Sequence, residues 1–320
     1  MGNVTEILTT DLDTLPVVQA WVGLEHGRRL PHRVEVLRRV KKSVVCRLAG
    51  VGPGRSDIIA KSCLRETGMV ERQVYTHVLP QLPVSRLQFH GLVEVPGTDF
   101  CWLFLEDARG DAFAPDDPRH RELATRWLAG LHTGSVALAE VLALPDRGTG
   151  YYRGEMRAAS RAMRENYDNP ALSQQDRELL DEMLAQFDFL ESRWDDVDDV
   201  CRVMPRSLVH NDFAERNVRI RDGQEVLVFD WEVAGWGLPA VDMAHVDVAL
   251  YWSFVRDVWP ALDLETLRRH VTLGKLLRGG IAASKWSAMS LATTWPETAN
   301  LQSYGRRIRH DLKVLGWTRR

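Results

Sequence analysis

The chain has 320 residues, of which 45% are hydrophobic and 27% charged, as in an ordinary globular protein. This length is sufficient for two domains or lobes, each with its own core. The net charge of −3 excludes a global basic field that would recruit nucleic acid or an anionic membrane. The N-terminus lacks the layout of a signal peptide, and no apolar run approaches the length of a membrane span. We therefore expect a soluble, cytoplasmic protein with no nucleic-acid or membrane partner.

Four cysteines are widely spaced and form no Cys-x-x-Cys pair, namely Cys46, Cys63, Cys101 and Cys201. This spacing argues against a zinc site and against a disulfide framework, and it fits a reducing compartment. Three of the four lie in apolar, strand-like runs. There, cysteine normally behaves as a small buried hydrophobe.

The first third of the chain changes from helical to β-like patterning near residue 33. An apolar segment over 15–24 predicts a helix, to which we assign no chemistry. Short apolar runs follow at 34–37, 44–48 and 57–61, separated by turn residues. Runs of this length and spacing predict an antiparallel meander.

Lys61 closes an apolar run and allows two interpretations. An edge strand often carries a lysine that faces water. The segment that follows, 69–79, has apolar residues at helical spacing and is ended by Pro80. Glu71 lies in the first turns of this predicted helix, from where it can reach Lys61. We therefore expect a Lys61–Glu71 pair.

The remaining pattern predicts two more strands and then mostly helices. The strands cover 87–95 and 100–105, and a helix begins near Asp117 and Pro118 with Leu123, Trp127, Leu128 and Leu131 on one face. Residues 145–172 are polar and predict an irregular segment with one basic helix around 156–164. Ser173 is expected to cap the next helix, and the acidic run 195–199 to be a solvated linker.

The chain is organised around two apolar runs that each deliver a carboxylate. Residues 208–218 contain Asp212 and, five residues later, Asn217. The second run ends at Asp230, and the Asp222–Gly223 turn between the runs predicts a hairpin. Folding the hairpin brings Asp212, Asn217 and Asp230 to one end of a small sheet. Oxygen ligands of this kind suit one base and a Mg²⁺ ion.

Taken alone, a His-x-Asp loop or an Asp-Trp turn is a common structural feature without chemistry. Together, His210-x-Asp212-x-x-x-x-Asn217 and the strand that ends Asp230-Trp-Glu232 resemble the catalytic signature of the aminoglycoside phosphotransferase and choline kinase family, relatives of protein kinases. The resemblance implies an α+β, two-lobed, protein-kinase-like fold. A small antiparallel β-rich lobe with a leading helix would cover residues 1–106, and a larger, mostly helical lobe residues 107–320.

The resemblance also implies roles for the individual residues of this chain. Asp212 would accept or orient the proton of an acceptor hydroxyl, while His210 would brace the loop. Asn217 and Asp230 would hold Mg²⁺ against the phosphates of ATP or GTP. Lys61, positioned by Glu71, would neutralise phosphate oxygens.

Two parts of the expected nucleotide site are less regular. The strand exit at 103–110 resembles the family's hinge between lobes, so the carbonyl of Glu106 and the amide of Ala108 would face the adenine. The phosphate-covering loop departs from the pattern, because the turn at 40–43 has no glycine. If a loop forms there, it would use Ser43 and backbone amides, with charge from Lys41 or Lys42.

The acceptor remains open among three interpretations. An antibiotic phosphotransferase for a polycationic drug would need a carboxylate-lined pocket, for which Glu232, Asp242, Asp247 and 195–199 are candidates. Asp242 is otherwise expected to cap the following helix.

A metabolic kinase for choline, homoserine or a sugar is the alternative. For choline, Trp236, Trp252 or Trp259 would supply cation–π contacts unless they are core residues. A catalytically inactive binding module is disfavoured, because Asp212, Asn217 and Asp230 are all present. We expect a monomer or homodimer.

Overall fold

The computed structural model describes residues 6–24, 29–40, 43–294, 296 and 298–317. The chain packs into two compact units, each built from two stretches of sequence. Unit 1 comprises Met1–Gly130 and Ala214–Ala234, and unit 2 comprises Leu131–Phe213 and Gly235–Arg320. The lobe boundary expected between residues 106 and 107 stays a prediction.

Unit 1 is built on a six-stranded antiparallel sheet with the strand order β1-β2-β3-β4-β6-β5. The predicted strands are confirmed. The short strand β1, which pairs Glu6 with Val36, was not predicted. The strands are β1 (Glu6–Leu8), β2 (Val34–Val40), β3 (Ser43–Leu48), β4 (Ile58–Leu64), β5 (Phe89–Glu94) and β6 (Phe100–Glu106).

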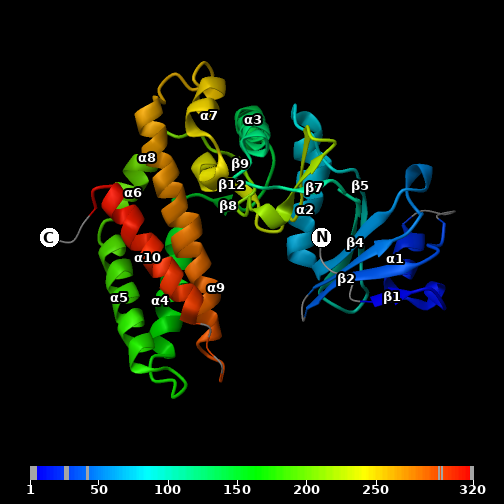
Figure 1. Cartoon of the computed structure of the whole chain (residues 1–320), viewed down its shortest axis with the longest axis horizontal. Helices are drawn as coiled ribbons and strands as arrows, with labels where there is room; N and C mark the ends of the chain where they lie inside the picture. The colour runs from blue at the N-terminus through cyan, green and yellow to red at the C-terminus, as the bar shows by residue number, and fades with distance from the viewer. Residues whose placement is uncertain (1–5, 25–28, 41–42, 295, 297, 318–320) are drawn as a thin grey trace. The chain divides into compact units, whose positions relative to one another are not determined.

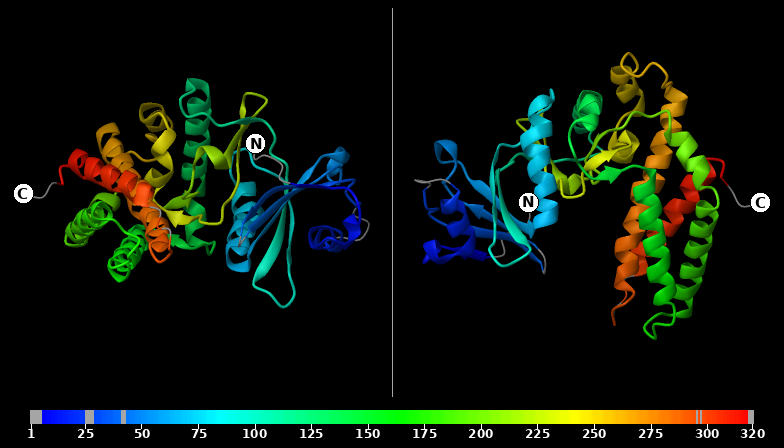
Figure 2. Two further views of the ribbon diagram at one scale, coloured as in Figure 1. Left: turned by 60° about the horizontal axis from the view of Figure 1, so that its bottom comes forward. Right: turned by 180° about the vertical axis from the view of Figure 1, so that it is seen from behind.

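The two faces of this sheet carry different helices, and Figure 2 shows them on opposite sides. Helix α1 (Pro16–Gly23) buries Val18 and Trp21 against the face that bears Phe104. Helix α2 (Arg65–Gln73) continues as the wider η3 turn (Val74–Val78) and the η4 turn (Leu79–Gln81). Side chains alternate along a strand, so Lys61, opposite Leu103 in the register, points to the other face. That face is covered by α2.

The predicted hairpin is confirmed and belongs to unit 1. Strand β10 (Val218–Arg221) pairs with β11 (Glu225–Val228) and with the two-residue strand β7 (Asp111–Ala112). Asp222 and Gly223 in the turn have φ of 52° and 66°, the left-handed values that a tight hairpin of the right twist requires. The hairpin is tied to the rest of unit 1, because Ser85 donates a hydrogen bond to the carbonyl of Val226.

Unit 2 combines a small sheet with a set of long helices. The sheet has the order β8-β12-β9, formed by β8 (Asp146–Arg147), β12 (Gly235–Gly237) and β9 (Ser207–Val209). In Figure 1 and Figure 2 the helices α4, α5, α9 and α10 lie side by side. The helices are α4 (Thr149–Glu165), α5 (Gln174–Glu191), α6 (Trp194–Cys201), α7 (Val248–Val255), α8 (Leu264–Gly274), α9 (Ala283–Ser290) and α10 (Thr298–Val314).

Helix predictions in unit 2 were partly wrong. The helix α3 (Pro118–Ser135), which runs from unit 1 into unit 2, and the Ser173 cap of α5 are confirmed, the cap as a capping box with Asp176. The basic helix expected around 156–164 is confirmed, but it is longer than expected, because α4 begins at Thr149 within the part expected to be irregular. The acidic run 195–199 is not a linker but part of α6, which buries Trp194, Val197 and Cys201. No helix in the described part of the chain is long and apolar enough to cross a membrane.

The elements that remain are short 3₁₀ segments and one π-helical segment, and the cysteines lie in the core. All four cysteines are buried, among them the three in apolar runs for which burial was expected. The short 3₁₀ segments are η1 (Leu12–Thr14), η2 (Pro53–Arg55), η5 (Val136–Glu140), η6 (Glu215–Asn217) and η7 (Pro239–His245). The π-helical segment η8 (Lys275–Ala282) lies between α8 and α9.

Candidate active site

In unit 1, one lysine is surrounded by three carboxylates. The Nζ atom of Lys61 lies 2.7 Å from Oε1 of Glu71 and 3.3 Å from Oε2 of Glu232, and it also donates to Oδ1 of Asp230. The Glu71 side chain is fully buried, whereas Glu232 is 42% exposed. The predicted Lys61–Glu71 contact is thus confirmed, and Lys61 is not a solvent-facing edge residue.

The charges in this cluster shift each other's protonation. Burial alone would lower the pKa of Lys61, but Glu71, Asp230 and Glu232 outweigh it and raise that pKa. Burial raises the pKa of Glu71 to about 7, against the opposing effect of Lys61. A single ammonium therefore does not fully compensate three carboxylates, and the cluster attracts a proton or a further cation.

The donor set fits a hard divalent cation. One carboxylate oxygen from each of Glu71, Asp230 and Glu232 lies within 4.8 Å of the others. With Lys61, these groups carry a formal charge of about −2 when all are ionised, which a divalent ion would balance. Glu232 was considered only as an acceptor-side residue, although its position two residues after Asp230 is the signal that places it here.

The hairpin brings Asn217 next to the segment that carries Asp230. Asn217 ends the η6 turn, is buried, and accepts a hydrogen bond at its carbonyl from the amide of Phe229, at 3.1 Å. This bond extends the β10–β11 pairing by one residue, to the position just before Asp230. Asp230 itself has a φ of 71°. Such a value is uncommon for a residue with a side chain, although aspartate is among those that tolerate it.

In unit 2, the loop that carries Asp212 is held through its backbone. The amides of His210 and Asn211 donate to the two carboxylate oxygens of Asp242, at 2.6 and 2.8 Å. Nδ1 of the buried His210 accepts from the amide of Asp212, at 3.2 Å. His210 therefore braces the loop, as expected.

Asp242 is structural, but not in the manner expected. Asp247, not Asp242, caps the following helix, because its side chain accepts from the amide of Leu250. Asp242 instead lies buried in η7, between the 210–211 amides and Nε2 of His132, at 3.5 Å. Its partners lie more than 30 residues away in the chain, and local patterning cannot predict such contacts.

Arg278 contacts the loop from another side and was not identified from the sequence. Its Nη2 lies 2.5 Å from Oδ1 of Asp212, and its Nε donates to the carbonyl of Asn211. Both charged side chains are largely buried, with 24% of Arg278 and 17% of Asp212 exposed. No motif surrounds Arg278 in the sequence, so no local signal predicted this pair.

The residues expected to contact the nucleotide lie on the sheet of unit 1. Ser43 begins β3 and pairs with Val40, which leaves a two-residue connection, Lys41–Lys42, that lies outside the described residues. Glu106 ends β6, where its side chain accepts from Arg221 at 2.5 Å and from the amide of Gln88 at 3.0 Å. Ala108 is buried just beyond it. Their nucleotide contacts stay predictions.

Most of the carboxylates expected to line an acceptor pocket have other partners. Asp242 is fully buried, Asp247 caps α7, and Asp196 and Asp199 form ion pairs with the arginines that flank α6. The indole of Trp236 is buried and donates to a backbone carbonyl, and that of Trp252 also donates to one, as core residues do. Trp259 is buried as well.

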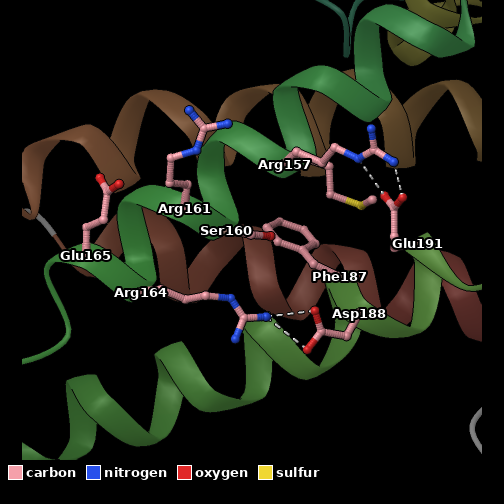
Figure 3. A pocket seen from close by; sticks show the side chains of 9 residues that line it. Arg157, Ser160, Arg161, Arg164, Glu165, Phe187, Asp188 and Glu191 are labelled. Carbon is pink, nitrogen blue, oxygen red and sulfur yellow. Dashed lines mark hydrogen bonds and ion pairs between the residues drawn. The ribbon is translucent and has the colours of Figure 1, made fainter.

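A cavity of about 350 Å³ lies between α4 and α5. Figure 3 shows Phe187 among its lining residues, together with ion pairs that join Arg157 to Glu191 and Arg164 to Asp188. None of the lining residues belongs to the two motifs. This cavity is therefore not where the predicted chemical groups gather.

Comparisons with known proteins agree with this arrangement. The family model described as the phosphotransferase enzyme family, APH, matches residues 60–276. No curated protein matches the sequence. The similar solved structures include an ethanolamine kinase from Plasmodium vivax, with 14% identity and a TM-score of 0.55 over 87% of this chain and 80% of that one.

Two antibiotic kinases are similar to the same degree. The macrolide 2′-phosphotransferase MphH from Brachybacterium faecium has 16% identity and a TM-score of 0.56, over 93% of this chain and 97% of that one. The GDP and kanamycin complex of APH(2″)-IIIa has 15% identity and a TM-score of 0.54, over 93% and 96%. The predicted kinase-like α+β fold is confirmed. Because the family model covers more than half of the sequence, the chain belongs to the phosphotransferase enzyme family and is a small-molecule phosphotransferase that acts on a hydroxyl group.

Proposed function

We propose that this enzyme transfers the γ-phosphoryl group of ATP or GTP to a hydroxyl of a small molecule. The observation that carries this proposal is the arrangement around Lys61, whose ammonium contacts both Glu71 and Asp230. An ammonium held in place beside a candidate metal ligand is what a site for a polyphosphate needs. The GDP complex of a similar structure supports a nucleotide as the donor.

Each side chain has one task in the proposed reaction. Asp212 accepts or orients the proton of the acceptor hydroxyl. Asp230 and Asn217 hold Mg²⁺, with Glu232 as a further oxygen ligand, and Glu71 keeps Lys61 aimed at the phosphates. A bound Mg²⁺ supplies charge neutralisation at the phosphate oxygens. Positioning and charge account for most of the acceleration in phosphoryl transfer, so this small set of residues suffices.

The nucleotide base is proposed to lie at the end of β6. There, the carbonyl of Glu106 and the amide of Ala108 would meet the adenine or guanine edge. The ion pair between Glu106 and Arg221 at 2.5 Å supports this, because it fixes the end of β6 to the hairpin that leads into Asp230. Ser43 would contact the phosphates from the start of β3.

For the acceptor, the first candidate is an antibiotic and the alternative is a hydroxylated metabolite of the choline, homoserine or sugar type. The kinases acting on macrolides or crystallised with kanamycin support the first, and the ethanolamine kinase supports the second. The commitment of Asp242 and Asp247 to structural contacts weakens the case for a polycationic drug.

The decisive experiment compares the wild type with Asp212→Ala and Asp212→Asn. We expect turnover to fall by about 10²–10⁴-fold while the affinity for Mg²⁺-nucleotide, measured by calorimetry, stays within about twofold. Turnover is first established by a coupled nucleoside-diphosphate assay with aminoglycosides, macrolides, nucleoside antibiotics, choline, ethanolamine, homoserine and sugars. Unchanged turnover in Asp212→Ala would remove Asp212 from the chemistry. Inactivity with every acceptor, together with no nucleotide binding, would favour the binding module.

A further inference from the structure

Hydrogen bonds with Asp242 and Tyr152 hold the loop at 210–212 on one side. Asp242 accepts from His210 and Asn211, and Tyr152 donates to Oδ1 of Asn211 at 2.6 Å. Asn211 has a φ of 60°. A left-handed conformation at a residue with a side chain persists only where the surroundings hold it. These contacts define the backbone of the loop, but none of them fixes the direction of the Asp212 carboxylate.

Arg278 supplies a contact of that kind. A guanidinium is planar and rigid, so one that binds two acceptors sets their relative direction. Here Nε binds the carbonyl of Asn211 and Nη2 binds Oδ1 of Asp212. The backbone before Asp212 and the carboxylate itself are thereby tied to one group.

The helix that carries Arg278 is itself fixed to the segment that carries Asp242. At Gly274, in the last turn of α8, an added Cβ would lie 2.1 Å from the carbonyl oxygen of Ala240. The two backbones are therefore in direct contact, and only glycine fits. Arg278 lies one turn later, in the π-helical segment η8, a type of turn often found at functional sites. The two groups that hold the loop thus share one rigid support.

We propose that Arg278 is the positioning residue for Asp212, selecting the carboxylate direction in which it meets the acceptor hydroxyl. This proposal rests on the proposed function, in which Asp212 handles the hydroxyl proton. Phosphoryl transfer depends on the placement of this group more than on its basicity. Arg278 touches neither nucleotide nor acceptor in this role.

The test uses Arg278→Met, Arg278→Lys and Arg278→Ala. In Arg278→Met we expect kcat to fall by about 100-fold, the effect of a small misplacement of a reacting group, with KM for the nucleotide unchanged. Arg278→Lys keeps the charge but cannot bind both acceptors in one plane, so it should recover only part of kcat. In Arg278→Ala, guanidinium chloride at millimolar concentration should raise kcat by about tenfold, since it restores one planar ion pair.

Lys285→Met is the matched control. Lys285 lies seven residues after Arg278, pairs with Glu155 at 2.6 Å, and is similarly exposed, at 28%. The proposal expects its kcat to match the wild type. A merely structural role for Arg278 predicts instead a lower melting temperature, similar losses in Lys285→Met, and no recovery with guanidinium beyond that seen with an equal concentration of sodium chloride.

Two failures are distinguishable. If Asp212→Ala is inactive while Arg278→Met keeps kcat within about threefold of the wild type, the positioning role is wrong and the proposed function stands. If Asp212→Ala itself keeps its turnover, the role of Asp212 is wrong and the positioning role falls with it, whereas the proposed function fails only if the wild type is inactive with every acceptor and binds no nucleotide.

Discussion

The Lys61 cluster of unit 1 and the Asp212 loop of unit 2 are held in different ways. In unit 1 the ammonium of Lys61 forms ion pairs with three carboxylates, so the arrangement of these side chains depends on charge. In unit 2 Asp242 holds the loop through two backbone amides, and Arg278 contacts the carboxylate of Asp212. The first arrangement should respond to pH and to cations, and the second to changes in geometry.

Both regions contain a left-handed residue, but at different positions. In unit 1 it is the candidate ligand Asp230 itself, and in unit 2 it is Asn211, the residue before the candidate base. The strain in unit 1 therefore aims a side chain directly, whereas in unit 2 it turns the backbone that presents Asp212.

The largest effect is expected from Asp230→Asn, which keeps the shape of the side chain and removes its charge. Turnover should fall by on the order of 10²–10³-fold, because a fixed charge at the phosphates is lost. Mg²⁺-nucleotide affinity, measured by calorimetry, should fall as well. Asp222→Asn is the control, because Asp222 lies in the same hairpin with a φ of 52° but is exposed in the turn. Equal activity of both variants would contradict a special role for Asp230.

The second prediction concerns pH and the buried Glu71. Burial raises its pKa in the folded protein to about 7, above the ordinary value near 4.5 in the unfolded chain. The unfolded chain thus releases this proton first, and the free energy of unfolding falls as the pH rises from 4.5 to 7. The fall amounts to about 3 kcal/mol at most. Glu71→Gln should lack it, as urea titrations at pH 5 and pH 7.5 would reveal; parallel curves for both proteins would contradict the prediction.

Asp242→Asn probes the other region. Its side chain accepts with only one oxygen, so one of the two amide bonds to His210 and Asn211 is lost. We expect the free energy of unfolding to fall by about 2 kcal/mol, since a buried donor loses its partner. Turnover should decrease while nucleotide affinity stays unchanged. A loss of nucleotide affinity alone would show that Asp242 serves the unit 1 chemistry instead.

The smallest effect is expected from Mg²⁺ added without nucleotide. At about tenfold above its dissociation constant, the ion should raise the melting temperature by roughly 2–4 °C. The rise should be larger at pH 8 than at pH 5.5, because protons compete for the carboxylates at the lower pH. Asp230→Asn should show a smaller shift, and an equal rise in both proteins would place the ion elsewhere.

The sequence predicted those features whose partners are local or follow a regular order of elements. The Lys61–Glu71 contact could be predicted because a strand is followed directly by a helix, so the two residues lie ten positions apart. The hairpin could be predicted from Asp222–Gly223, which only a tight turn favours.

The features that were missed depend on distant contacts or on competing patterns. Asp242 and Arg278 contact the 210–212 loop from 31 to 67 residues away in the sequence, and no local pattern indicates these contacts. In α6 the run of acidic residues is typical of a solvated linker, whereas the helical spacing of Trp194, Val197 and Cys201 indicates a helix. In that case the correct signal was present in the sequence.

The division of unit 1 into two stretches has a consequence for synthesis on the ribosome. Residues 1–130 emerge first, but the hairpin that completes this unit, residues 214–234, follows only after all of 131–213 has been made. Until then the contact that Ser85 makes with the hairpin cannot form, because that segment has not been translated. Domains generally fold as units during translation. In this chain the nascent N-terminal part must therefore persist incomplete, and the lysine at position 61 acquires two of its three carboxylate neighbours only late in elongation.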